Sequence, residues 1–500
     1  MILFELINST EVVAKLALFF GCNQDSNFTG SFFYKLKNLN KHRFFSYALG
    51  AVAPRFFSFI FIPLFSHFLS QKDLGSYDLL ITSISLFAPL LSLSLGDACY
   101  RFSYNANQSS TFNIVKTAIF FGFCLHFLLL IGTCLFLYFY PHSIDFLSLL
   151  VVFTSSFFLL FQSFPRVFQR IQLYAYMGII NPACILCSSV LLFHVYNKNL
   201  TSIKLAIIIS NLFALLVIVV KIDMLKLLKK GIFDSKILKI LLQFSLPLVL
   251  NTVGWWLVFF SNRFIITWAL GIEANAIYAV ANKIPSILFI ANSIFILSLQ
   301  DFVFEKTDEA RLNFDFTLVF KKQFIFQFTL AFVILASSKT IISLLFPAVY
   351  GTAYQLSPLI FLGIIFTNFA SFWGVFFSAK KETMRLLRTT LVGGLLNIIF
   401  TLFFIRSLAL YAPALGTCLG FLAIWIIRIY QLRRDVIINF DKKMLLNFSL
   451  LFMFFSYSQF FSSTILDFFT IILSCFVFIF YHFDLIKTNF KRLKIVIFKP

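Results

Sequence analysis

Charge is what this 500-residue chain has least of. Only 12% of its residues are Asp, Glu, Lys or Arg, whereas 60% are hydrophobic. A water-facing surface needs about 25% charged residues, so the composition excludes a soluble globular protein of this length. The charges are also unequal in sign, with 41 Lys and Arg against 20 Asp and Glu. We therefore predict an integral membrane protein built from helices.

Cysteine clusters and long polar loops are also scarce. The eight cysteines include one C-x-x-C pair, Cys184 and Cys187, inside an apolar run with no second pair. Two thiols cannot fill a four-ligand zinc site, so we expect no metal centre and no cofactor. No loop is long enough to hold a separate catalytic core. These absences predict that the protein is not an enzyme and has no catalytic residues.

The chain also begins without the features of a cleaved signal peptide. Residues 16–20 form an apolar run that is too short to cross a bilayer. Glu5 and Glu11 stand where a signal peptide has basic residues. We expect residues 1–43 to be a cytoplasmic extension lying at the membrane surface.

Long apolar runs are what the sequence does contain. A membrane helix needs about 20 apolar residues, and about fourteen runs meet that length. We predict an all-α polytopic membrane protein with helices at 44–68, 76–100, 114–139, 144–165, 174–196, 201–222, 239–268, 274–300, 318–346, 353–378, 386–406, 410–430, 444–461 and 465–484.

Basic residues fall in alternate loops. They gather at 221–239, 301–322, 380–388, 428–443 and beyond 485, whereas the turns near 141, 348 and 463 have none. Basic loops stay in the cytoplasm, so we predict a multi-pass membrane protein with both termini cytoplasmic. The net charge of +21 then reflects orientation in the membrane, and we expect no nucleic-acid partner.

The basic loop after the sixth run divides the chain into two six-helix repeats followed by two further helices. The predicted parts are an extension at 1–43, a first lobe at 44–222, a basic linker at 223–238, a second lobe at 239–431, the last two helices at 444–484 and a basic cytoplasmic tail at 485–500.

Residues 46–102 and 244–301 share a layout, in which two apolar runs flank a hinge. The hinges contain Gly75 and Tyr77 in one case and Gly271 and Tyr278 in the other. Each first run also carries a proline and a cation. Interrupted helices in corresponding positions of two repeats point to a transporter's binding site. We therefore expect helices one, two, seven and eight to border a common cavity.

Cations inside apolar runs are candidates for binding a substrate, because charges in the membrane face a protein interior or a water-filled cavity. Arg55 lies deep in the first run, Lys283 lies deep in the eighth, and Arg263 lies near the end of the seventh. For each, the alternative is a contact with a structural partner. We predict all three as substrate-binding residues for an anion.

Three further residues are candidates for gating or coupling. Asp97 and Arg101 are four residues apart, a spacing that favours an ordinary helix salt bridge over a gate. His126 can titrate near neutral pH, but a lone histidine on an apolar helix is more often simply packed. Four asparagines in apolar runs indicate interhelical hydrogen bonds more than sugar contacts: Asn251, Asn282, Asn292 and Asn397.

Several stretches between residues 44 and 435 resemble the lipid-linked oligosaccharide flippases of O-antigen synthesis. These belong to the multidrug/oligosaccharidyl-lipid/polysaccharide (MOP) exporter superfamily. The stretches are APRFFSFIFIPLFSHFLSQKDLGSYDLL, SLGDACYRF, FSLPL with SNRF and IYAVANKI, VYGTAYQLSPLIFL, and SAKKETMRLLRTTLVGGLLNIIF. The chain departs from that pattern where Asn262 precedes Arg263 in place of an Asp. It departs again at residues 411–413, where a Gly-rich turn is reduced to Tyr-Ala-Pro.

The resemblance implies a substrate, namely an undecaprenyl-diphosphate carrying an oligosaccharide repeat unit. It also implies a location in the bacterial inner membrane and membrane lipids as partners, with polysaccharide polymerase and chain-length machinery as further candidates. Three alternatives stay open: a drug or metabolite exporter of the same fold, a membrane glycosyltransferase or polymerase, and a flippase for the peptidoglycan precursor. The exporter would need buried carboxylates, and those seen are near helix ends or in a hinge: Asp97, Glu273 and Asp467.

Overall fold

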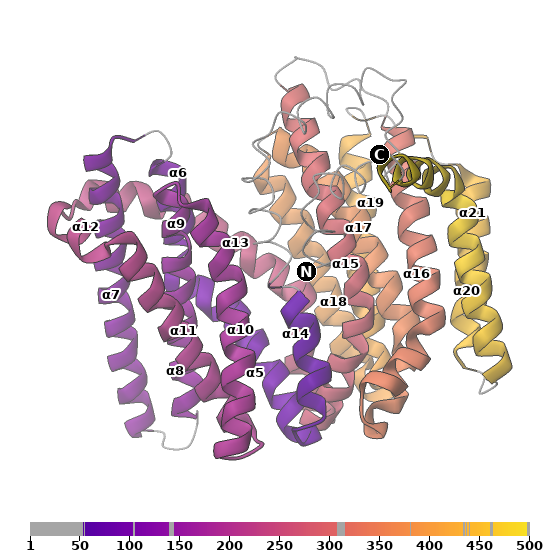
Figure 1. The fold of residues 1–500 in the computed structure, drawn as a ribbon, viewed down its shortest axis with the longest axis horizontal. Helices are drawn as coiled ribbons and strands as arrows, with labels where there is room; N and C mark the ends of the chain where they lie inside the picture. The colour runs from indigo at the N-terminus through magenta and orange to yellow at the C-terminus, as the bar shows by residue number, and fades with distance from the viewer. Residues whose placement is uncertain are drawn as a thin grey trace. The chain divides into compact units, whose positions relative to one another are not determined.

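The computed structural model describes residues 54, 56–103, 106–139, 145–307, 316–380, 382–433, 436, 438–439, 441–460 and 464–497. Every regular element in these ranges is a helix (Figure 1). The chain divides into two compact units, each with most of its contacts inside itself. The first unit is His42–Ala276, and the second contains Ile277–Pro500.

Besides the apolar helix Phe56–Ser66, the first unit holds ten helices in its described part and the start of another. They are α5 (Gln71–Ser92), α6 (Leu95–Ser103), α7 (Gln108–Phe139), α8 (Phe146–Gln162), α9 (Phe164–Val167), α10 (Ile171–Val195), α11 (Leu200–Ile222), α12 (Met224–Lys230), α13 (Ser235–Phe259), α14 (Ser261–Leu270) and the beginning of α15 (Ile272–Thr307).

The described part of the second unit continues from α15 through seven more elements. They are α16 (Thr317–Leu345), the 3₁₀ helix η1 (Ala348–Leu356), α17 (Ser357–Ala379), α18 (Thr383–Leu408), α19 (Tyr411–Leu432), α20 (Lys442–Ser458) and α21 (Thr464–Ile497).

Twelve helices in the described ranges are long and apolar enough to cross a membrane. The apolar helix Phe56–Ser66 and the 17-residue α20 coincide with the two remaining predicted runs. The predicted all-α polytopic membrane fold is confirmed. The boundary of the two predicted lobes at 223–238 stays a prediction, and in the structure α13 and α14 belong to the first unit.

The predicted runs 76–100 and 239–268 contain breaks that the sequence analysis did not foresee. The run 76–100 divides after Ser92, where Leu93 and Ser94 have φ of 47° and 48°. Left-handed backbone in two successive non-glycine residues cannot continue an α-helix. The run 239–268 divides at Phe260, whose φ is −122°; no proline or glycine marks that break.

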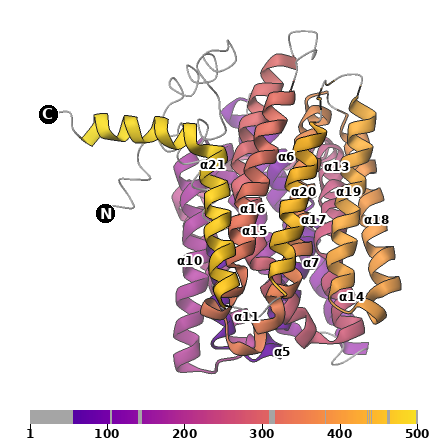
Figure 2. The same ribbon diagram turned by 90° about the vertical axis from the view of Figure 1, so that its right-hand side faces the viewer.

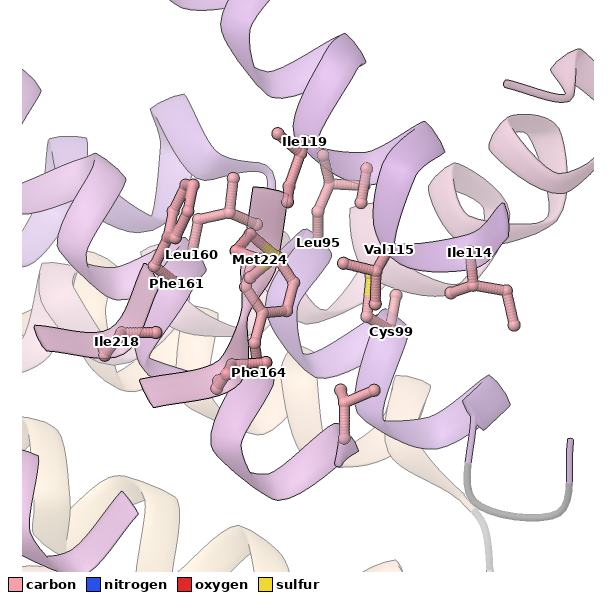
Figure 3. Packing of buried hydrophobic residues seen from close by; sticks show 14 of the residues in the cluster. Leu95, Cys99, Ile114, Val115, Ile119, Leu160, Phe161, Phe164, Ile218 and Met224 are labelled. Carbon is pink, nitrogen blue, oxygen red and sulfur yellow. The ribbon is translucent and has the colours of Figure 1, made fainter. Parts of the chain in front are cut away.

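The first unit has a buried core at the end where α6, α7, α8, α9, α11 and α12 meet. Figure 3 shows Leu95, Val115, Leu160 and Phe164 pointing toward one another from these helices. Met224 of the short α12 packs into the same cluster and is 1% exposed. Burying a large apolar side chain contributes about 1.5–3 kcal/mol, so this cluster fixes the short helices around the break after Ser92.

In the second unit, α16 is the contact surface for the last two helices, α20 and α21 (Figure 2). Phenylalanine rings interlock there, with Phe332 stacked on Phe448 and on Phe455. Polar contacts add to them. Lys339 pairs with Asp467 at 2.7 Å, and Ser338 donates to Gln459 Oε1 at 3.1 Å. Interhelical polar contacts of this kind hold membrane helices together.

Candidate functional site

The two predicted hinges touch each other in the first unit. Gly75 of α5 lies so close to the start of α15 that a Cβ on it would be 2.1 Å from the Ile272 carbonyl oxygen. Only glycine permits this approach. Gly271, the residue before Ile272, has a φ of 94°, a left-handed conformation that also favours glycine. Gln71 Nε2 donates to the Glu273 carbonyl at 3.1 Å. The pattern noticed in the sequence therefore marks a real contact between α5 and the α14–α15 turn.

Beside this contact lies a buried ion pair that the sequence analysis missed. Arg263 Nε is 3.4 Å from Asp78 Oδ2, and the two side chains are 10% and 13% exposed. Arg263 also donates to the Phe259 carbonyl at 2.5 Å and lies 5.2 Å from the Phe260 ring centroid. Asn275 Nδ2 donates to the Gly75 carbonyl at 3.0 Å. We name Gly75, Asp78, Arg263 and Asn275 the hinge cluster.

The hinge cluster corrects two expectations. The acid absent at Asn262 is supplied by Asp78, from a helix far away in sequence, and Asn262 itself is fully buried. The expectation that membrane carboxylates lie near helix ends or in a hinge is wrong for Asp78, which lies within α5 and has a side chain only 13% exposed. Its sequence signal was an acid inside an apolar run, a position that is energetically expensive in a membrane unless the acid is paired.

The remaining predicted substrate-binding cations are placed differently. Arg55 lies outside the described residues. Lys283 lies in α15 within the second unit and is half-buried. Their predicted convergence on one cavity stays a prediction.

Asp97 pairs with a residue that the sequence analysis did not consider. Its Oδ1 lies 3.9 Å from Arg166 Nη1 of α9, whereas Arg101 is exposed. The predicted partner was therefore wrong: α6 packs against α9, which brings Arg166 to Asp97, while Arg101 of the same helix points to an exposed position. Desolvation raises the pKa of the Asp97 carboxyl, and the nearby Arg166 opposes that rise.

His126 is 3% exposed, and both of its ring nitrogens have partners. Nδ1 lies 2.7 Å from the Gly122 carbonyl oxygen and Nε2 lies 2.9 Å from Ser156 Oγ. The Phe157 ring lies 4.1 Å away between centroids. This geometry favours the interpretation that His126 is a packed structural residue, and a role in proton coupling stays a prediction.

The second unit contains a buried cation that the sequence analysis placed in a cytoplasmic loop. Arg428 is fully buried in α19 and donates to Thr389 Oγ1, Thr390 Oγ1 and the Ala370 carbonyl at 3.1, 3.1 and 2.6 Å. It thereby joins α17, α18 and α19. Among the described residues no carboxylate lies within ion-pair distance of it.

The asparagine prediction is confirmed for Asn292. Its Oδ1 accepts from Gln323 and Gln327 of α16 at 3.0 and 2.7 Å. Asn368 of α17 donates to Gln327 Oε1 at 2.8 Å, which extends the network across three helices. Asn282, by contrast, donates to the Tyr278 carbonyl of its own helix.

Comparison with known proteins assigns the chain to a family. The family model described as polysaccharide biosynthesis protein matches residues 41–300. No curated protein matches the chain in sequence.

Solved structures with the same fold are membrane transporters. An inward-facing multidrug resistance MATE family transporter of the MOP superfamily is 14% identical with a TM-score of 0.60, over 81% of this chain and 94% of its own. The lipid II flippase MurJ, in an inward closed conformation, is 14% identical with a TM-score of 0.60, over 87% and 99%. An outward-facing MATE structure gives a TM-score of 0.53 at 14% identity, over 81% and 94%. At such identity the likeness shows the fold alone, which this chain shares with these transporters.

Proposed function

The chain belongs to the polysaccharide biosynthesis protein family, and we propose that it moves undecaprenyl-diphosphate-linked oligosaccharide repeat units from the cytoplasmic to the periplasmic leaflet, for synthesis of O-antigen or another surface polysaccharide. The family match over residues 41–300 carries the proposal. The fold shared with a protein named as a lipid II flippase supports it, since that protein is also a flippase.

Charge in the described spans favours an anionic substrate over the cation-exporter alternative. The buried Asp78 is paired with Arg263, and Asp467 is paired with Lys339 at 2.7 Å. A carboxylate neutralised by a neighbour is a poor ligand for a cationic drug. Arg55 and Lys283 are the cations that we propose to hold the diphosphate by charge-assisted hydrogen bonds.

Arg263 takes a different place in this proposal. Its charge is neutralised by Asp78, so we remove it from the diphosphate-binding set and assign it to the hinge cluster. In alternating access, ends of helices must close and open in turn. The hinge cluster joins α5 to the α14–α15 turn and is suited to hold one end closed.

Complementation tests the proposal. Expression in a strain that lacks its O-antigen flippase should restore surface polysaccharide. The same plasmid should not rescue depletion of a lipid II flippase and should not raise resistance to cationic drugs. Rescue of lipid II flipping without polysaccharide export would favour the peptidoglycan-precursor alternative, and drug resistance alone would favour the exporter.

A further inference from the structure

A polar cavity of about 100 Å³ opens at the break between α5 and α6, away from the hinge cluster. Water needs roughly 10–15 Å³ of such space per molecule, so the cavity has room for a small polar group. Serine hydroxyls, an amide and charged side chains lie on its wall. It is lined by Ser92, Ser94, Gly96, Asp97, Leu159, Leu160, Gln162, Ser163, Arg166 and Tyr174.

Arg166 is the cationic residue on the wall of this cavity. Its guanidinium carbon lies 4.1 Å from the Tyr100 ring centroid and 5.2 Å from that of Tyr174. The nearest anion is Asp97, at a loose 3.9 Å. Nε is buried and has no hydrogen-bond partner. Arginine presents five N–H donors and no acceptor, and in the part of the chain that the structure describes the Arg166 guanidinium donates no hydrogen bond, its contact with Asp97 being an ion pair at 3.9 Å.

The surroundings hold that guanidinium in place. Tyrosine rings on a guanidinium restrict its orientation. The wall behind it is the buried core of the first unit, in which Leu160 is 1% exposed and Phe164 is fully buried (Figure 3). Gly96 and Ser163 are in such close contact that a Cβ on Gly96 would be 2.6 Å from Ser163 Oγ. The donors are therefore fixed before a ligand arrives, which lowers the entropic cost of binding.

Position and shape select the ligand. Arg166 lies at the end of the span Phe146–Val167, and α6 lies outside the candidate spans, at the depth where lipid headgroups meet protein. A cation would be repelled by Arg166. A phosphoryl group has oxygens that match the arginine fork, and it is compact enough for this volume.

We propose that this cavity is a binding site for a phosphoryl group of a lipid headgroup, held by Arg166 between Tyr100 and Tyr174. The phosphoryl chemistry follows from the cavity alone. The more specific hypothesis, that the bound group is the diphosphate of the carrier lipid before transport, rests on the proposed function. The other source is an ordinary anionic phospholipid.

Binding measurements on the purified full chain in detergent test this site without requiring export. The probes are undecaprenyl diphosphate, phosphatidylglycerol and inorganic diphosphate. Arg166→Gln should weaken binding of the preferred probe at least tenfold, and Arg166→Lys should lose less, since it keeps the charge but not the fork. Lys226→Gln is the matched control: it removes one positive charge in the same unit from a side chain that is 79% exposed, and should leave affinity unchanged.

A second variant separates ligand binding from a merely structural ion pair. Asp97→Asn removes the carboxylate that competes for Arg166, so binding of the diphosphate probes should be at least as tight as in the wild type. Equal weakening by Asp97→Asn and Arg166→Gln, or no effect of Arg166→Gln on any probe, would overturn the proposal.

The probes also distinguish the two sources. Preference for undecaprenyl diphosphate supports the carrier-lipid reading, and preference for phosphatidylglycerol supports the phosphoryl site with a membrane lipid in it. If the protein fails complementation but its lipid binding still depends on Arg166, the transport proposal is contradicted and the proposed phosphoryl site is supported.

Discussion

Asp78 and Arg263 are two charges that the membrane interior tolerates only together. Each is nearly buried, and each compensates the other at 3.4 Å. Removing one partner of a buried pair leaves an uncompensated charge, which typically costs about 3–5 kcal/mol. The pair therefore constrains the fold whether or not it also moves during transport.

We predict that Asp78→Ala and Arg263→Ala each lower the thermal unfolding midpoint of the purified protein strongly, while the double variant loses less than the sum. The expected coupling is about 0.5–3 kcal/mol, the range for residues in contact. Differential scanning fluorimetry on all four proteins measures it.

The control cycle uses Asp223 and Lys226, an exposed pair at 3.8 Å in the same unit. Its coupling should stay below about 1 kcal/mol, as for surface ion pairs. Additive losses at Asp78 and Arg263, equal to those of the control, would mean that the two side chains do not interact in solution.

Gly374 shows how closely Arg428 is packed. A Cβ on Gly374 would lie 3.0 Å from Arg428 Nη1, the atom that donates to the Ala370 carbonyl. We predict that Gly374→Ala displaces the guanidinium and destabilises the protein by about 1–3 kcal/mol, the usual range for overpacking.

Gly363 on the same helix provides the matched control, measured by the same fluorimetric unfolding. A Cβ there would meet nothing closer than 3.6 Å. Because alanine is a better helix former than glycine by about 1 kcal/mol, Gly363→Ala should be neutral or stabilising. If both variants behave alike, the crowding around Arg428 is not what decides the outcome at Gly374.

At the scale of helices, contacts within the first unit group the helix ends as the basic-loop alternation requires. The Ile232 backbone N–H, just before α13, donates to Asn113 Oδ1 near the start of α7 at 2.8 Å, which joins two helix ends predicted as cytoplasmic. Lys204 near the start of α11 pairs with Asp145, the N-cap residue of α8, at 2.6 Å, which joins two helix ends predicted on the other side. A missing or additional helix between these ends would have placed the partners on opposite sides.

The absolute orientation is a prediction of its own. Reporter fusions at Phe233 and at Phe440, which lies outside the described residues, should report the cytoplasm. A fusion at Tyr350 should report the periplasm. Basic loops resist export, which is the reason for this assignment. A periplasmic signal at Phe233 contradicts the topology; protein level and membrane insertion of each fusion serve as controls.

At the scale of the whole molecule, transport requires that cations hold a diphosphate without trapping it. We predict that Arg55→Ala or Lys283→Ala abolishes polysaccharide export in a flippase-null strain while the protein stays inserted. Arg55→Lys should keep part of the activity, since lysine retains the charge and loses bidentate geometry. Surface polysaccharide, normalised to protein level, is the measurement.

The matched control is Lys226→Ala, an exposed cation whose loss should leave export unchanged. Full export by the Arg55→Ala, Lys283→Ala double variant at normal expression would reject the cationic-cavity mechanism and leave both residues with structural roles.

The sequence by itself determined the membrane class, the positions of the spans and the family. These depend on the length and composition of local segments, because a bilayer selects apolar runs of about 20 residues whatever they pack against. The glycines of the two hinges were also visible, since a glycine between apolar runs marks a special backbone position.

Tertiary structure alone decided which charges meet. Asp78 finds Arg263, Asp97 finds Arg166 instead of the neighbouring Arg101, and Arg428 finds two threonines and a carbonyl. These partners lie on different helices, and the kink at Leu93 and Ser94 that reorients α6 has no signature in local hydropathy. A side chain's partner depends on how helices rotate and pack, which many distant contacts fix together, so no local segment of the sequence contains it.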